Sequence, residues 1–148
     1  MWWNHNRLFA RYFVPDGISV ILNFLTLGFV LLFVYSIQVF MHAPGPDSIT
    51  FYAGSFAITF LLLGVLYLMG AIRKRDALTQ EEFRRGFIRG LRHTCMAAGI
   101  LVALIILTRV GLHVRTIGYL FFPPALFMIA VSRLAPLFWP ALRKQPAR

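Results

Sequence analysis

Long apolar runs separated by short polar connections dominate the pattern of this chain. Two runs, 18–41 and 51–72, contain no charged residue, and a third, 94–114, contains one, Arg109. The fourth run, 117–138, is interrupted by Arg133 and is the weakest of the set. Because about 20 apolar residues cross a hydrocarbon core as a helix, each run predicts a membrane-spanning helix.

This pattern predicts an all-α integral membrane protein with one domain over residues 1–148. The four spans would form a four-helix bundle of two transmembrane hairpins. We expect an amphipathic helical segment before the first span, lying at the membrane surface as an interfacial foot, and a cytoplasmic basic linker over 73–93. Asp16 is placed to cap the first spanning helix, and the proline- and glycine-containing stretch 42–47 predicts a tight turn after it.

The basic linker contains a second amphipathic stretch, 79–92. Thr79 and Glu82 have the spacing of a capping box, which marks the start of a helix. Apolar residues line one face of that helix, and we expect it to lie at the inner membrane surface. Its arginines would bind anionic lipid head groups or a protein partner, and they are Arg84, Arg85, Arg89 and Arg92. Gly86 and Gly90, four residues apart, would let another helix approach closely.

Composition and charge support the membrane interpretation and orient the chain. Hydrophobic residues make up 59% of the chain and charged residues 14%, and the net charge is +10. The two termini and the second connection carry 13 of the 15 Lys and Arg residues. The positive-inside rule then places both termini in the cytoplasm of a bacterial inner membrane. The charge is explained by orientation and lipid contact, so we expect no nucleic-acid partner.

Polar residues inside the spans favour packing over proton transport. No Asp or Glu falls within a span, which disfavours a carboxylate-driven exporter. Ser19, Asn23 and Thr26 form a polar seam on the first span that should face another helix. Small residues recur at four-residue spacing, Ala53 with Ala57 and Ser55 with Thr59, and also predict close helix contacts.

The outer side carries the residues that would form a ligand site, if the protein has one. They are Arg109, Arg115, Asp47, His42 and His113. For Arg109 we expect snorkelling to the interface, with Asp47 as its natural ion-pair partner. A metal site on His42, His113 and Asp47, or a hydrolase triad using Ser48, is much less favoured. The single cysteine, Cys95, excludes a disulfide within the chain, and we expect no metal, cofactor or catalytic residue.

These features lead to three hypotheses about function. The first is a multi-pass accessory, assembly or immunity-type protein that associates with a larger membrane partner. The second is a homo-oligomeric channel or transporter for a small anion, using Arg109 and the polar seam. The third is a membrane enzyme or carrier for a lipid-linked substrate, although the chain lacks a catalytic motif and an enzyme is the less favoured class.

Overall fold

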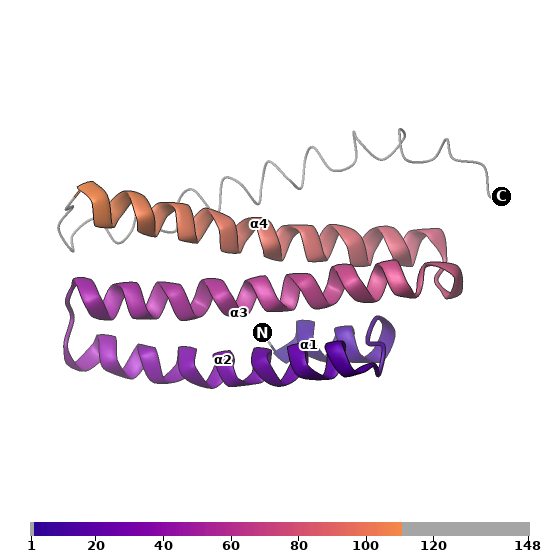
Figure 1. Cartoon of the computed structure of the whole chain (residues 1–148), viewed down its shortest axis with the longest axis horizontal. Helices are drawn as coiled ribbons and strands as arrows, with labels where there is room; N and C mark the ends of the chain where they lie inside the picture. Colours follow the sequence, from indigo (N-terminus) through magenta and orange to yellow (C-terminus); the bar gives the residue numbers. More distant parts are fainter. Residues whose placement is uncertain (1, 111–148) are drawn as a thin grey trace.

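The computed structural model describes residues 2–110, which are helical apart from the connections (Figure 1). The helices are α1 (Trp2–Arg11), α2 (Gly17–His42), α3 (Pro46–Arg73) and α4 (Gln80–Val110). A short 3₁₀ turn, η1 (Arg75–Ala77), lies between α3 and α4. The last predicted span, 117–138, lies outside the described residues. The predicted bundle of two hairpins is therefore described only as far as its first three long helices.

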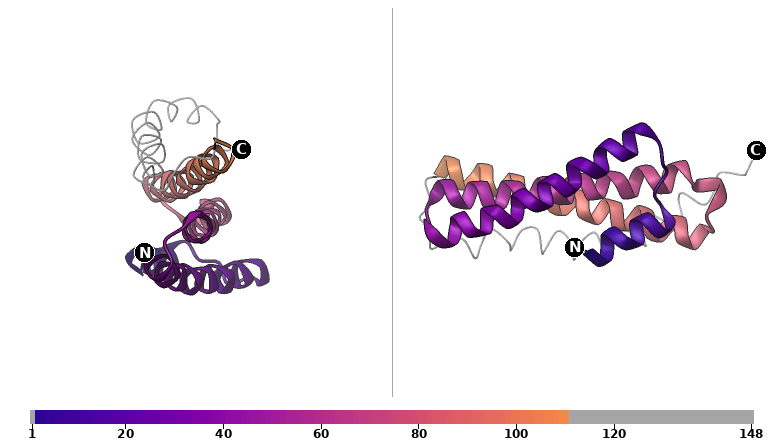
Figure 2. Two further views of the ribbon diagram at one scale, coloured as in Figure 1. Left: turned by 90° about the vertical axis from the view of Figure 1, so that its left-hand side faces the viewer. Right: turned by 90° about the horizontal axis from the view of Figure 1, so that it is seen from below.

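The three long helices are antiparallel neighbours, and α3 lies between α2 and α4 (Figure 2, left). Each is long and apolar enough to cross a membrane, with a mean hydropathy of 2.4 for α2, 2.2 for α3 and 1.4 for Gln80–Ile106 of α4. Half of the most apolar window of α3 is buried, against 11% for α2. The protein is therefore an all-helical membrane protein in which α3 forms the centre of the described part.

The helix starts follow the capping signals of the sequence. Asp16 accepts a hydrogen bond of 2.7 Å from the main-chain N–H of Ser19, which confirms it as the cap of α2. At the start of α4, the Thr79 N–H donates to a Glu82 carboxylate oxygen at 3.2 Å, and the Glu82 N–H donates to the Thr79 hydroxyl at 3.3 Å. The predicted capping box is confirmed, because each side chain satisfies the other residue's amide.

One prediction about α4 is wrong: the arginine-rich stretch is not a separate helix lying on the membrane. It is the beginning of a single 31-residue helix that continues into the third span. Neither proline nor a glycine-based cap separates the two parts of the sequence, so nothing ends the helix between Arg92 and Thr94. The connection after α3 is correspondingly only residues 74–79.

Small and hydroxyl-bearing residues of α3 pack against its two neighbours, and Ala53 and Ala57 belong to a buried cluster shared with α4. Ala53, Ala57, Ser55 and Thr59 are all buried on α3, as their spacing predicts. The Ser55 hydroxyl lies 3.0 Å from the hydroxyl of Ser36 on α2, so one hydrogen bond joins the helices in a buried position. Such contacts stabilise membrane helices because lipid offers hydroxyl groups no alternative partner.

The N-terminal helix α1 is amphipathic, as predicted, but it does not project away from the bundle. It runs beside the first turns of α2 (Figure 2, right), and Nε2 of His5 lies 2.9 Å from Oδ1 of Asn23. Leu8 and Tyr12 are buried in a cluster with Leu63 and Tyr67 of α3. We call the end of the bundle where α1 meets α3 and α4 the basic end.

Candidate functional site at the basic end

Close contact between α3 and α4 fixes the level of the arginines along the bundle. A methyl group added at Gly90 would lie 2.6 Å from Cγ of Leu68, and one at Gly64 would lie 2.5 Å from Oγ1 of Thr94. Arg92, between Gly90 and Thr94, therefore lies level with residues 64–68 of α3. This position is about 10 Å inside the charged end of α3, at 1.5 Å per helical residue.

This register places arginines beside an uncharged part of α3. Residues 51–72 of α3 carry no charge, and Arg89 and Arg92 lie alongside the last turns of this run, whereas Arg84 and Arg85 are level with its charged end. Charged side chains at such a level are costly, and they are found paired, facing a water-filled space or reaching to the interface. The arginines of α4 therefore need groups that compensate their charge.

The arginines fall on two flanks of α4. Arg85, Arg89 and Arg92 follow Glu82 at intervals of three, four and three residues, so these four residues form one stripe. Because Tyr12 and Arg11 contact Glu82, this stripe lies on the α1 side. We call Arg85, Arg89 and Arg92 the α1-side stripe. Arg84 belongs to the other flank.

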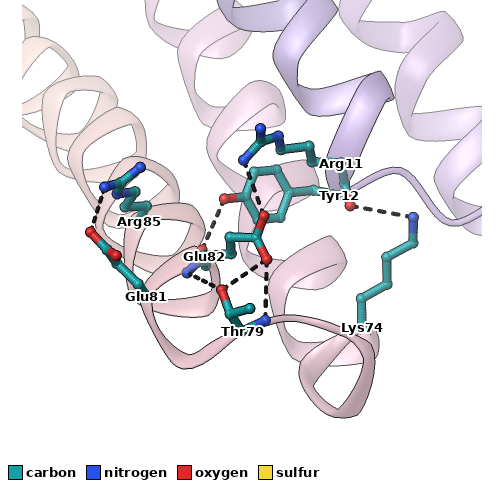
Figure 3. Close-up of polar contacts among 7 residues, drawn as sticks. All are labelled: Arg11, Tyr12, Lys74, Thr79, Glu81, Glu82 and Arg85. Atoms are coloured by element: carbon teal, nitrogen blue, oxygen red, sulfur yellow. Dashed lines mark hydrogen bonds and ion pairs between the residues drawn. The ribbon is translucent and has the colours of Figure 1, made fainter.

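The two glutamates at the start of α4 are bound to cations (Figure 3). Arg11 pairs with Glu82 at 3.1 Å, and Arg85 pairs with Glu81 one turn earlier in α4. Arg73 pairs with Asp16. Within residues 2–110, no carboxylate pairs with Arg84, Arg89 or Arg92, which are three of the four arginines in the first turns of α4. Nε of Arg92 is in addition buried without a hydrogen-bond partner among the described atoms.

Two buried tyrosines organise the contact between α1, α3 and α4. The Tyr12 hydroxyl donates a 2.9 Å hydrogen bond to the Glu82 carbonyl, and the ring centroids of Tyr12 and Tyr67 are 5.5 Å apart. The Arg89 side chain lies near the Tyr67 hydroxyl. Burial raises the pKa of the Tyr12 hydroxyl, against the opposing effect of the nearby Arg89 charge. The hydroxyl therefore stays protonated and able to donate.

Gly86 and Gly90 allow the close approach that their spacing predicts, and the segments that approach them belong to this same chain. Gly90 faces Leu68 of α3, and a methyl group at Gly86 would collide with the ring of Tyr12. Sequence reasoning did not single out Tyr12 and Tyr67 as site residues. The signal for Tyr12 was its place in the amphipathic N-terminal segment, while Tyr67 lies in a uniformly apolar run without a distinguishing pattern.

The polar seam on α2 is confirmed as a packing surface. Ser19 and Thr26 are buried, and the Ser19 hydroxyl lies 3.5 Å from a guanidinium nitrogen of Arg73. Asn23 bonds to His5, and the Thr26 hydroxyl donates to the carbonyl of Leu22. These polar groups are therefore satisfied inside the protein.

The structure does not assemble the predicted outer ligand site from its described members. Arg109 and Asp47 are both exposed near the same end of the bundle, yet they form no ion pair in the described part. His42 contacts the Gln38 carbonyl at 2.8 Å, and the Ser48 hydroxyl donates to the Gly45 carbonyl at 3.0 Å. Ser48 and His42 thus bond to the main chain and not to each other. His113 and Arg115 lie outside the described residues.

Over residues 2–110, no three His, Cys, Asp or Glu side chains are grouped closely enough to share a metal ion. Comparisons with protein-family models, curated proteins and solved structures give no match. The case for function therefore depends on the residues of this chain, and the strongest concentration of unbalanced charge within the described range is on α4.

Proposed function

We propose that this chain is a multi-pass membrane protein of the accessory, assembly or immunity type, which acts by associating with a larger membrane protein. We place it in the bacterial inner membrane with its termini in the cytoplasm. One observation carries the proposal. Four arginines follow one another within α4, of which Arg89 and Arg92 lie level with the uncharged part of α3, and three of the four lack a carboxylate partner in the described range.

Association with a membrane partner would compensate the charge of these arginines. A membrane partner can offer carboxylates or carbonyl groups to arginines that are costly in lipid alone. It can also recognise the particular positions of the arginines along α4, which a uniform lipid surface cannot do. Arg84 is the natural contact, because it lies on the flank of α4 away from α1 and is only half-buried.

Charge reversal tests the association. The wild-type chain is purified in mild detergent, its co-purifying membrane protein is identified, and recovery of that protein is then measured for Arg84→Glu. We expect recovery to fall at least tenfold, since unpairing buried charge pairs is strongly unfavourable. Unchanged recovery would count against a docking role.

Two controls separate docking from misfolding. Arg109→Glu makes the same change at an exposed position near the opposite end of α4 and should leave recovery unchanged. Circular dichroism and gel filtration should show that Arg84→Glu keeps its helical content and size. Equal loss of the partner from both charge variants would indicate a general charge effect.

The described contacts do not favour the two other hypotheses. The seam suggested as an anion path is filled by the side chains of His5 and Arg73. The Ser48 hydroxyl suggested for hydrolysis bonds to the Gly45 main chain. Association is therefore the function that the geometry supports best.

A further inference from the structure

Arg89 and Arg92 occupy an unusual position on the α1-side stripe. Both side chains are partly exposed, although their main chain lies level with the uncharged end of α3. Side chains of a helix lean toward its N-terminus. In α4 that direction leads from the apolar middle of the bundle to the basic end. Both arginines therefore extend toward the level at which lipid phosphates lie.

The surroundings favour an anion and fix how it would be held. Arg89 lies beside Tyr67, whose side chain is fully buried. Arg7 on α1 also acts electrostatically on Tyr67, so basic residues of two helices are near this region. Glu82, the carboxylate on the same stripe, already accepts hydrogen bonds from Arg11 and Thr79. The stripe is therefore electropositive.

We propose that Arg89 and Arg92 form a binding site for the phosphate of an anionic phospholipid from the cytoplasmic leaflet. The two guanidinium groups, three residues apart on one helix face, would bind the phosphate oxygens by charge-assisted hydrogen bonds. Tyr67 acts as a positioning residue that holds the Arg89 guanidinium. The site rests on the proposed function in taking the basic end of the bundle as the cytoplasmic one.

A lipid suits this position better than a protein carboxylate. Helical side chains lean toward the helix N-terminus, which for α4 is the end nearest the head groups, whereas a partner helix would approach from the side. Lipid at this site would also compensate charge on the α1 side of α4 and leave Arg84, on the other flank, for a protein partner. The two flanks of α4 then have separate ligands.

Native mass spectrometry of the full chain in detergent tests the site. The protein is mixed with phosphatidylglycerol or with zwitterionic phosphatidylcholine, and the retained lipid is counted. We expect the wild type to retain phosphatidylglycerol preferentially. Arg89→Gln/Arg92→Gln should lose about thirtyfold in affinity, given the roughly 1 kcal/mol that each of the two basic residues contributes at an anionic surface. Arg84→Gln/Arg109→Gln removes the same charge elsewhere and should retain the lipid.

Further variants keep the result interpretable if the glutamine variant does not fold. Arg89→Lys/Arg92→Lys preserves both charges but not the planar fork, and it should weaken retention by about threefold. Tyr67→Phe removes the group that positions Arg89 and should weaken retention with the charges unchanged. Equal retention by the wild type and these variants would overturn the site.

The outcomes distinguish this site from its alternatives. If inorganic phosphate at millimolar concentration displaces the lipid, the ligand is a free anion and the lipid proposal is wrong. If Arg89→Gln/Arg92→Gln keeps the lipid but loses the co-purifying protein, the stripe binds a protein carboxylate. The lipid site then fails while the proposed function stands. Loss of the lipid with the protein partner retained supports a separate lipid site.

Discussion

The contact between α3 and α4 at Gly64 gives the most direct test of the register that fixes the arginines. A Cβ atom at this position would lie 2.5 Å from Oγ1 of Thr94, 2.8 Å from the Thr94 main-chain nitrogen and 2.9 Å from the Gly90 carbonyl oxygen. A side-chain rotation could remove only the first contact. The other two involve main-chain atoms, so Gly64→Ala must push the helices apart.

The expected loss of stability follows from two opposing effects. Overpacking of this kind costs about 1–3 kcal/mol. Replacing a helical glycine by alanine returns about 0.5–1 kcal/mol, because the unfolded chain loses conformational freedom. We therefore expect Gly64→Ala to destabilise the protein by about 1–2 kcal/mol.

Gly54 provides the matched control on the same helix. A Cβ atom at Gly54 would meet no heavy atom within 4 Å, so Gly54→Ala should be neutral or stabilising by up to about 0.5–1 kcal/mol. The unfolding free energies are compared in bicelles or in a denaturing-detergent titration followed by circular dichroism. Equal stabilities of the two variants would refute the register, and with it the level assigned to the arginines.

Three other predictions test separate parts of the structure. Tyr12→Phe should cost about 1 kcal/mol of unfolding free energy by removing the hydrogen bond to the start of α4. Because burial raises the Tyr12 pKa, this hydroxyl should stabilise the fold fully below pH 10 and lose that effect as the pH rises through its folded-state pKa. If Tyr12→Phe removed a phenolate that titrates near pH 10 in the absorbance of the folded protein, this would contradict the burial of Tyr12. A double-mutant cycle of Ser36→Ala and Ser55→Ala should give a coupling of about 0.6–1.7 kcal/mol, and additive losses would argue against their hydrogen bond. In a cysteine-free background, Asp47→Cys should react with an impermeant maleimide from outside the cell and Asp76→Cys only after permeabilisation, whereas the reverse result would invert the predicted orientation.

Much of the fold could be predicted from the sequence because the bilayer imposes simple requirements. The uncharged runs 18–41 and 51–72 match α2 and α3 closely, since length and apolarity alone define a span. The helix caps formed by Asp16 and by the Thr79–Glu82 pair could be predicted because capping is an interaction between residues close in sequence. The seam on α2 was predictable because polar residues on one face of an apolar helix need a partner.

The structure of the basic end could not be predicted in the same way. An amphipathic surface helix and the first turns of a spanning helix share the same 3.6-residue period, so the pattern over 79–92 fits both. What separates them is the tertiary contact of Gly64 with Thr94 and of Gly90 with Leu68. The return of α1 along the bundle likewise depends on space beside distant glycines, which periodicity does not reveal.

At the basic end, the packing of the helices determines where the arginines lie, whereas the arginines do not determine the packing. A methyl group would collide with neighbouring atoms at Gly64, Gly70, Gly86 and Gly90, all in the half of the bundle that carries the arginines, whereas Gly28 and Gly54 face open space. Close packing therefore sets the level of Arg89 and Arg92, while these partly exposed side chains contribute little to the packing. Gly64→Ala should accordingly weaken both stability and lipid retention, and Arg89→Gln should weaken retention alone. A stability loss from Arg89→Gln as large as that from Gly64→Ala would mean that the arginine is part of the core and not a ligand-binding residue.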